Sequence, residues 1–187
     1  MIYVKDDFLD INVINILNKD KNVFQEVKTP GKSFWVKMPS DKFMELVCEE
    51  ICKIENVKIK PILGFFREAK EGQDNDWRIH NDSIIEGQQP DRACVLYVSE
   101  EQEDGLNGTA FWEHWNHGEK FENVSIEEQN RLLKEDANSP EKWRLKSVIG
   151  HKKNRLISYP CNYFHSKYPN EFIDSRKVFV MFYKIEK

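Results

Sequence analysis

Two residues near the middle of the chain have the types and spacing of metal ligands. The segment WRIHND places His80 and Asp82 two positions apart, after a half-apolar run that is typical of a β-strand. Side chains at positions i and i+2 of a strand point to the same face, so this imidazole and this carboxylate can converge on one ion. The alternative is an exposed turn, because Asn and Asp often end strands. The rest of the sequence has to decide between the two interpretations.

A third candidate ligand, His165, lies downstream in NYFHSKYP. Taken alone, a histidine after two aromatic residues is typical of a buried and hydrogen-bonded side chain. Together with His80 and Asp82 it makes a set of two histidines and one carboxylate, which leaves three adjacent coordination positions open on a metal such as Fe(II). A structural site would need a further protein ligand.

Arg176 and Tyr97 are candidate anion-binding residues. Arg176 opens the run RKVFVMFYK, where alternation places it on one face with Val178, Val180 and Phe182. A guanidinium on an apolar face is costly unless an anion meets it, and Arg binds a carboxylate through two parallel hydrogen bonds. Tyr97, in ACVLYV, has a hydroxyl that can share that anion. The alternatives are an Arg176 that bends into solvent and a Tyr97 that is a core aromatic.

Apolar spacing predicts the elements that must position these residues. Helices are predicted over 11–18, over 41–55 with Ser40 as N-cap, and over 126–135, where Ser125 and Glu128 form a capping box. From residue 57 apolar residues recur at every second position instead. This alternation predicts strands over 58–69, 77–80, 93–98, 109–113, 143–149, 154–159 and 176–184. The sequence GHKKN predicts a hairpin that joins 143–149 to 154–159.

These elements predict a single domain that is mainly β, with flanking helices. Residues 1–60 are expected to be a helical N-terminal support, and residues 61–187 a β core with an insert at 114–142. The insert is long, charged and carries its own capped helix, so we expect an ordered flap near the mouth of a barrel. Packing or dimer contacts away from the site are the alternative.

Aromatic and histidine side chains flank the start of this insert. Trp112 and Trp115 are candidates for the substrate entrance, with core packing or burial in a dimer or lid as the alternatives. His114 and His117 form an HxxH pattern, but no carboxylate or thiol completes a known metal spacing. We therefore interpret the pair as a polar loop over the mouth of the barrel.

Composition excludes several classes of protein. The 187 residues are 40% hydrophobic and 12% aromatic, enough for a folded core in one domain. The net charge of −4 comes without a basic cluster, so no nucleic-acid partner is expected. MIYVKDDFLD lacks the apolar centre of a signal peptide, and the apolar run VFVMFY is too short to span a bilayer. We expect a soluble cytoplasmic protein with free cysteines and no membrane partner, and the sequence leaves a homodimer open.

The order of the candidate ligands resembles a known family. HND at 80–82, YFH ending at His165 and Arg176 eleven residues later are similar to the HxD…H…R pattern of Fe(II)/2-oxoglutarate-dependent dioxygenases. CVLYVSE at 94–100, the segment Gly108-Thr-Ala-Phe, and NRLISYPCNYFHS at 154–166 resemble the prolyl 4-hydroxylase-like branch. The similarity covers roughly residues 63–184.

This resemblance implies a double-stranded β-helix, a jelly-roll or cupin-like barrel, in which His80, Asp82 and His165 hold Fe(II). Arg176 would bind the distal carboxylate of 2-oxoglutarate, with O2 as the other cosubstrate. Tyr97 matches a tyrosine that assists this arginine, whereas Val178 departs from the Ser or Thr of many relatives.

The activity implied is hydroxylation of a peptidyl side chain such as proline, or of a small metabolite. The alternatives are a cupin-like metal-binding protein without 2-oxoglutarate turnover and a non-catalytic binding module.

Overall fold

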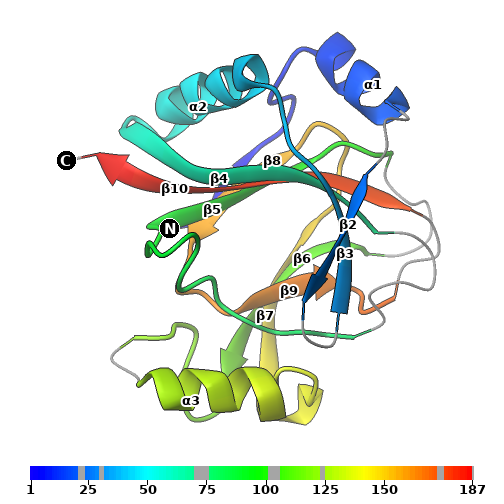
Figure 1. The fold of residues 1–187 in the computed structure, drawn as a ribbon. Helices are drawn as coiled ribbons and strands as arrows, with labels where there is room; N and C mark the ends of the chain where they lie inside the picture. The colour runs from blue at the N-terminus through cyan, green and yellow to red at the C-terminus, as the bar shows by residue number, and fades with distance from the viewer. Residues whose placement is uncertain are drawn as a thin grey trace.

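The computed structural model describes residues 1–20, 24–29, 32–69, 76–100, 106–122, 125–171 and 175–186 (Figure 1). In chain order the elements are β1 (Tyr3–Lys5), α1 (Ile11–Lys19), β2 (Gln25–Thr29), β3 (Lys32–Lys37), α2 (Asp41–Glu55), β4 (Lys58–Ala69), β5 (Arg92–Tyr97), β6 (Gly108–His114), α3 (Ile126–Arg131), the π-helical turn η1 (Leu132–Asp136), the 3-10 turn η2 (Pro140–Lys142), β7 (Trp143–Gly150), β8 (Leu156–Pro160), β9 (His165–Tyr168) and β10 (Arg176–Glu186).

Two antiparallel sheets form the body of the molecule. The major sheet has the strand order β1-β8-β5-β10-β4-β3-β2, and the minor sheet has the order β7-β6-β9. Figure 1 shows α1 and α2 above the major sheet and α3 below the minor sheet. The mainly β architecture with flanking helices that the sequence predicts is confirmed, as two separate sheets rather than one continuous barrel.

The alternation of β10 explains how the major sheet separates two cores. Phe179 and Met181 point to the helix side, where they pack with Phe43, Val47 and Ile51 of α2. The three α2 residues are spaced four apart, so they lie on one stripe of the helix. On the other side, Val178 and Phe182 pack toward the minor sheet with Phe111, Ile157 and Tyr159. The candidate site lies on this inner side.

Polar contacts fix both N-terminal helices on the major sheet. The Nζ of Lys177 donates to the carbonyls of Leu17, Asn18 and Asp20 at the C-terminal end of α1, where a cation is favourable. The carboxylate of Glu55, at the end of α2, accepts hydrogen bonds from Arg92 and from other side chains of the sheet. A buried ion pair of this kind is costly to break by removing one partner.

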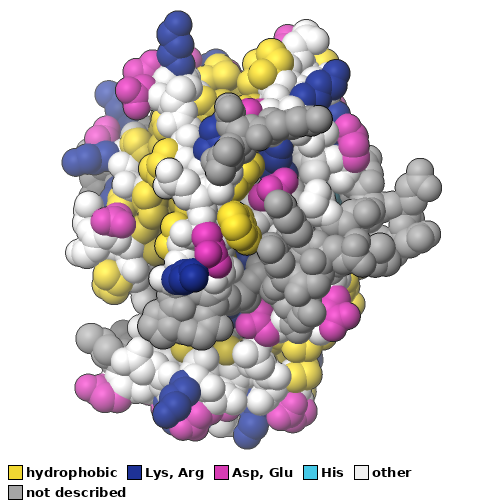
Figure 2. Space-filling model, turned by 45° about the vertical axis from the view of Figure 1, so that its right-hand side comes forward, with side chains coloured by type: hydrophobic (Ala, Val, Ile, Leu, Met, Phe, Trp, Pro, Cys, Tyr) yellow, Lys and Arg dark blue, Asp and Glu magenta, His cyan; other side chains and the backbone are white. Residues whose placement is uncertain are grey.

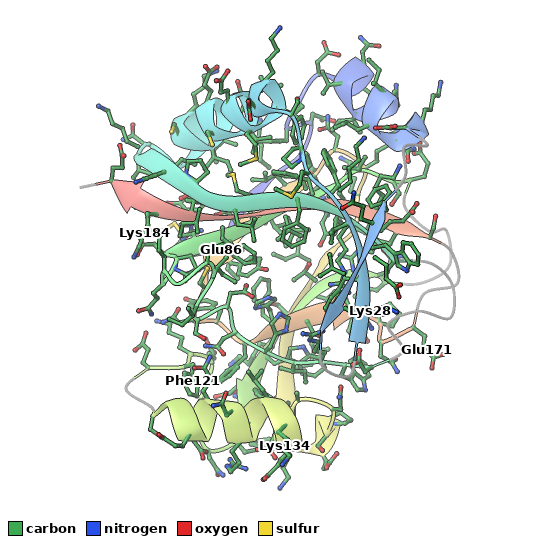
Figure 3. All side chains as sticks on the ribbon, in the orientation of Figure 1. Lys28, Glu86, Phe121, Lys134, Glu171 and Lys184 are labelled. Atoms are coloured by element: carbon green, nitrogen blue, oxygen red, sulfur yellow. The ribbon has the colours of Figure 1, made fainter. Side chains whose placement is uncertain are left out.

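The insert 114–142 covers the outer face of the minor sheet. Leu132 of η1 packs with Trp112, Trp143 and Phe164 from the three strands or their flanks, and with Ile79. Lys134, which is exposed, marks the solvent side of this segment in Figure 3. None of the described residues of the insert lines the cavity between the sheets. The structure therefore does not support the predicted flap. The insert instead buries apolar side chains of the minor sheet, on the side away from the cavity.

Three further expectations from the sequence need correction, and one strand was missed. Residues 1–60 are not only helical, because they supply β1 and the β2–β3 hairpin, which extends the major sheet. Residues 77–80 form no strand, since only His80 makes a β-bridge. Strand β9 was not expected. The segments 143–149 and 154–159 do not form a hairpin, because β7 pairs with β6 whereas β8 pairs with β5.

The remaining predictions of elements agree closely with the structure. Ser40 and Ser125 cap α2 and α3 through their hydroxyl oxygens, which accept the N–H groups of Phe43 and Glu128. The four cysteines are free. None of the helices in the described part of the chain has the length and apolar character needed to cross a bilayer.

Candidate functional site

The three predicted ligands lie together on the wall of one cavity. One ligand atom each from His80, Asp82 and His165 falls within 4.8 Å of the others. The Nε2 atom of His80 is 3.6 Å from Oδ1 of Asp82, and the Nε2 atom of His165 is 3.3 Å from Oδ2 of the same carboxylate. The structure therefore brings together the residues that the sequence pairs only by type and order.

Backbone hydrogen bonds hold the three residues in place. His80 and His165 form an isolated antiparallel bridge in which the N–H of each donates to the carbonyl of the other, at 3.0 and 2.8 Å. The N–H of Asp82 donates to the carbonyl of Cys161 at 2.9 Å. Two distant segments are thereby joined directly at the ligands, although the first of them is not a strand.

The ring orientation of both histidines leaves Nε2 available. The Nδ1 atom of His80 is 2.7 Å from the carbonyl oxygen of Arg78, and that of His165 is 3.0 Å from the carbonyl oxygen of Tyr163. A carbonyl only accepts, so each Nδ1 carries the proton and each neutral ring has its lone pair on Nε2. Two lone pairs and a carboxylate then face one point. This donor set fits a divalent transition metal.

Removal from water sets the charge state of the site. The pKa of His80 lies well below its ordinary value, chiefly because of burial and then because of His165. Burial raises the pKa of Asp82, and the nearby His165 opposes that rise. A neutral imidazole is the form that binds metal, and a bound cation relieves the cost of the buried carboxylate.

Arg176, at the start of β10 in the major sheet, lines the same cavity. It lines the cavity with Val178, Val180 and Phe182, the face predicted from alternation. The side chain is buried, and its guanidinium carbon is 5.2 Å from the centre of the Tyr97 ring. Burial lowers the pKa of Arg176, but a guanidinium stays charged in proteins. A positive charge thus faces an otherwise apolar wall.

Tyr97 is fully buried behind this wall and is not among the cavity-lining residues. Its hydroxyl is 2.8 Å from Oγ1 of Thr109, which does line the cavity. Thr109, on β6, therefore brings to the cavity wall a hydroxyl that contacts Tyr97. Sequence reasoning missed it, although Gly108-Thr-Ala-Phe was already among the segments that carry the family resemblance.

The cavity has a volume of about 490 Å³, within the usual range for pockets that bind small molecules. Most of its wall is apolar, and the hairpin β2–β3 closes one side. The lining residues that sequence reasoning did not select are Val27, Phe34, Val36, Met38, Leu63, Phe65, Arg67, Ala69, Arg78, Glu86, Val95, Thr109, Tyr159, Ser166 and Lys167.

The two tryptophans expected at a substrate entrance do not line the cavity. Trp112 is buried on the outer face of the minor sheet, where its Nε1 donates to Ser166 at 2.9 Å. Trp115 is 61% exposed, and its Nε1 donates to the carbonyl of Glu141 within the insert. Alternation along β6 explains the position of Trp112, because Thr109 and Phe111 face inward whereas Ala110 and Trp112 pack in the outer cluster.

The HxxH residues lie on the outer side with the insert, not over the cavity. His114 is 2% exposed, and its Nε2 is 3.2 Å from Oδ2 of Asp136. The Nε2 of His117 is 2.9 Å from Oε1 of Glu128 in α3. Among the described residues, the cluster of His80, Asp82 and His165 is the one whose donor atoms are close enough for a shared ion.

Comparison with known proteins gives similarity in structure but not in sequence. No family model matches the sequence, and no curated protein matches it significantly. Among solved structures, HygX from Streptomyces hygroscopicus with nickel and 2-oxoglutarate bound has a TM-score of 0.64 at 11% identity, over 98% of this chain and 82% of that one.

Two prolyl hydroxylases have the same fold. A Pseudomonas putida prolyl-4-hydroxylase has a TM-score of 0.56 at 9% identity, over 100% of this chain and 93% of that one. The viral collagen prolyl hydroxylase of Paramecium Bursaria Chlorella virus-1, in its 2-oxoglutarate complex, has a TM-score of 0.54 at 12% identity, over 100% and 96%. The double-stranded β-helix fold expected from the sequence is thus confirmed.

Proposed function

We propose that this protein is an Fe(II)/2-oxoglutarate-dependent oxygenase that hydroxylates a small molecule or a peptidyl side chain. One observation carries the proposal: the Nε2 lone pairs of His80 and His165 and the carboxylate of Asp82 face one point, in a cavity that Arg176 also lines. Two histidines and one carboxylate leave positions open for other ligands, as a reactive centre requires.

Each residue has a separate role in this proposal. His80, Asp82 and His165 hold the metal through the atoms that already converge. Arg176 binds the distal carboxylate of 2-oxoglutarate, and its burial strengthens that contact because water competes poorly there. In this proposal Thr109, which also lines the cavity, shares this carboxylate through its hydroxyl, and Tyr97 orients that hydroxyl through their 2.8 Å hydrogen bond. When bound, iron activates dioxygen and couples decarboxylation of 2-oxoglutarate to substrate hydroxylation.

The structures with a similar fold support this proposal by what they bind. HygX has been crystallised with iron, with nickel and 2-oxoglutarate, and with hygromycin B in addition. The viral prolyl hydroxylase has been crystallised with 2-oxoglutarate. The proposal includes a cytoplasmic location, with neither nucleic acid nor membrane as a partner.

The test is 2-oxoglutarate binding and turnover in matched variants. We expect the wild type to release succinate when iron is present. Arg176→Ala should weaken 2-oxoglutarate binding more than about tenfold, because it removes one charge-assisted contact worth roughly 1.5–3 kcal/mol. Metal binding should persist in that variant. Arg144→Ala, which removes a half-exposed arginine on β7, is the matched control.

The same measurement separates the alternatives. A wild type that binds nickel or iron but not 2-oxoglutarate would be a cupin-like metal-binding protein. A wild type that binds neither would be a non-catalytic module. An unchanged 2-oxoglutarate titration in Arg176→Ala would also contradict the proposed role of this residue.

A further inference from the structure

Two arginines lie close to the face of one aromatic ring in the cavity. The guanidinium carbon of Arg67 is 4.6 Å from the centre of the Phe34 ring, and that of Arg78 is 4.7 Å from it. All three residues line the cavity. Stacking on an aromatic ring fixes a guanidinium in place while leaving its edge able to donate hydrogen bonds. Neither arginine belongs to the metal ligands or to the proposed 2-oxoglutarate contact.

The backbone of Arg78 is held in an uncommon conformation. Its φ is +44°, in the left-handed region that residues other than glycine rarely occupy. Two contacts hold it there: the N–H donates to Oδ1 of Asn138 at 2.8 Å, and the carbonyl accepts the Nδ1–H of His80 at 2.7 Å. Such strain is concentrated at functional sites, where surrounding structure enforces it. In this conformation the carbonyl of Arg78 contacts the ring of His80, one of the three candidate ligands.

The Arg78 side chain has a donor that the described residues leave unsatisfied. Its Nη1 atom is buried and has no hydrogen-bond partner among the residues that the structure describes. A buried guanidinium nitrogen without an acceptor is costly, and an anion in the cavity would remove that cost. The acceptor would lie in the cavity, because the arginine lines it.

The rest of the cavity matches an amphipathic anion. Once Asp82 and Arg176 are assigned to the metal and the cosubstrate, the other charged lining residues are Arg67, Arg78, Lys167 and a single carboxylate, Glu86. The hairpin adds an apolar wall of Val27, Phe34, Val36 and Met38. In Figure 2 the side of the molecule that carries the hairpin is turned forward, and hydrophobic side chains lie there beside Lys and Arg.

We propose that the substrate of this cavity carries a carboxylate that Arg78 binds, next to an apolar portion that packs on Phe34 and the β2–β3 hairpin. A carboxylate fits better than a dianionic group because Arg78 has one unsatisfied nitrogen rather than a set of them. This inference rests on the proposed function, because the bound molecule is a substrate only if the protein is an oxygenase. It adds the chemical class of that substrate and the residue that selects it.

Matched pairs of probes test the charge preference. Calorimetry on protein loaded with nickel and 2-oxoglutarate compares 4-phenylbutanoate with 4-phenylbutanamide, and hexanoate with hexanamide. We expect each acid to bind the wild type at least tenfold more tightly than its amide. Arg78→Met should reduce that ratio below twofold, whereas Arg144→Met should keep it. Arg144 is a matched control because it also stacks on an aromatic ring, that of Trp115, but outside the cavity.

Two further variants keep the test decisive if Arg78→Met folds poorly. Arg78→Lys should keep part of the preference for the acid, and Arg78→Glu should prefer 4-phenylbutylamine over both other compounds. Equal binding of acid and amide by the wild type would overturn the proposal. So would an acid preference that survives in Arg78→Met but disappears in Arg176→Ala, because the probe would then occupy the other arginine.

Failure of the proposed function has a different signature. A wild type that prefers the acids but neither binds nor turns over 2-oxoglutarate would support the carboxylate site and contradict the proposed oxygenase activity. A wild type that releases succinate but shows no acid preference would retain the oxygenase and lose this inference.

Discussion

At the scale of single residues, the carboxylate of Asp82 is in an environment that favours a metal and disfavours the empty site. Both nearby Nε2 atoms present lone pairs, because each Nδ1 donates to a carbonyl. Burial raises the pKa of the carboxyl group, so the charged form is held at a cost in the fold. The site is thus organised for binding at the expense of stability, which is common in functional sites.

Replacing Asp82 separates these two effects. Asp82→Asn should weaken nickel binding more than about 100-fold, beyond the loss typical of an outer partner of a ligand. The metal-free variant should melt at or above the temperature of the metal-free wild type, because Asn has the size of Asp but carries no charge that has to be buried. Calorimetric metal titration and thermal melting with and without nickel measure both effects.

Glu86→Gln is the control for this prediction, because Glu86 is the other carboxylate on the cavity wall. It should bind nickel as the wild type does, and nickel should still raise its melting temperature. Nickel binding by Asp82→Asn at wild-type affinity would show that the metal lies elsewhere.

The site residues differ in how well the sequence predicts them. His80 and Asp82 are visible because their spacing is local, and His165 and Arg176 because their types and order complete the set. Thr109 was not selected, since nothing in its strand shows which neighbour its hydroxyl meets. Its partner, Tyr97, is twelve residues away and on the other sheet. Contacts between sheets depend on the final packing, and a period of two does not specify them.

At the scale of elements, α3 and η1 support the segment that carries the first two ligands. The N–H of Ile79 donates to the carbonyl of Ala137, and the side chain of Asn138 accepts from Arg78. Gln129 donates from Nε2 to Asn81 and Ser83, the two neighbours of Asp82. The insert therefore orients the ligand segment although it does not reach the cavity.

Gln129→Ala should loosen this segment without changing a ligand. We expect nickel binding to weaken about three- to tenfold, less than the roughly 10- to 100-fold typical of losing a direct partner of a ligand. Asn130→Ala, at the next and exposed position of α3, should have no effect. The two titrations are compared under the same conditions, and equal affinities would show that α3 does not orient the ligands.

His114 makes the stability of this region depend on pH. Its Nδ1 accepts the N–H of Asn116, so its Nε2–H donates to Asp136 and the ring is neutral. Burial lowers the pKa of His114 from its ordinary value of 6.5, against the hydrogen bond to Asp136 and with the help of His117 and Arg131. Below pH 6.5 the unfolded chain then binds a proton that the folded chain does not.

The free energy of unfolding should therefore fall as the pH drops below 6.5, by at most about 1.4 kcal/mol per pH unit for this residue. Urea denaturation of the metal-free protein between pH 8 and pH 5.5 measures this slope. His114→Gln should have a shallower slope, with the part due to His80 remaining. An unchanged slope in the variant would rule out His114 as a source of the pH dependence.

Strand pairing was the least predictable feature of the elements. The strands β7 and β8 were recognised from their alternation, but they were assigned to one hairpin. The connecting residues instead bond to two different strands or their ends: His151 N–H to the carbonyl of Asn107, and Asn154 N–H to the carbonyl of Tyr97. The chain thus passes from one sheet to the other. Turn-like composition marks such a crossing and a hairpin turn equally well.

At the scale of the whole molecule, the layers explain why the insert exists. Each sheet has one face toward the cavity core and one face that needs a cover. The helices α1 and α2 cover the major sheet, and the insert covers Trp112, Trp143 and Phe164 on the minor sheet. The sequence predicts a capped helix here but not the face that it covers, because the central strand of the minor sheet, β6, is buried on both of its faces.

Two adjacent leucines in η1 distinguish a structural cover from a flap. Leu132 is 3% exposed and packs on the minor sheet, whereas Leu133 is 41% exposed. Leu132→Ala should lower the free energy of unfolding by about 2–5 kcal/mol, because it leaves a void in a packed core. Leu133→Ala should change it by less than about 0.5 kcal/mol, as is usual for surface substitutions. Chemical denaturation of both variants measures the difference.

A flap would give a different result in a second measurement on the same pair. If the insert closed over the reaction, loss of its packing would leave 2-oxoglutarate decay intact while substrate oxidation fell. For a cover that holds the ligand segment through Ile79 and Arg78, we expect both activities of Leu132→Ala to decline together with metal affinity, and both to persist in Leu133→Ala. If a Leu132→Ala variant as stable as the wild type consumed 2-oxoglutarate without oxidising substrate, the flap interpretation would be supported instead. The backbone carbonyl of Ala137 and the side-chain oxygen of Asn138 favour the cover, because they accept N–H groups of the ligand segment while neither residue lines the cavity.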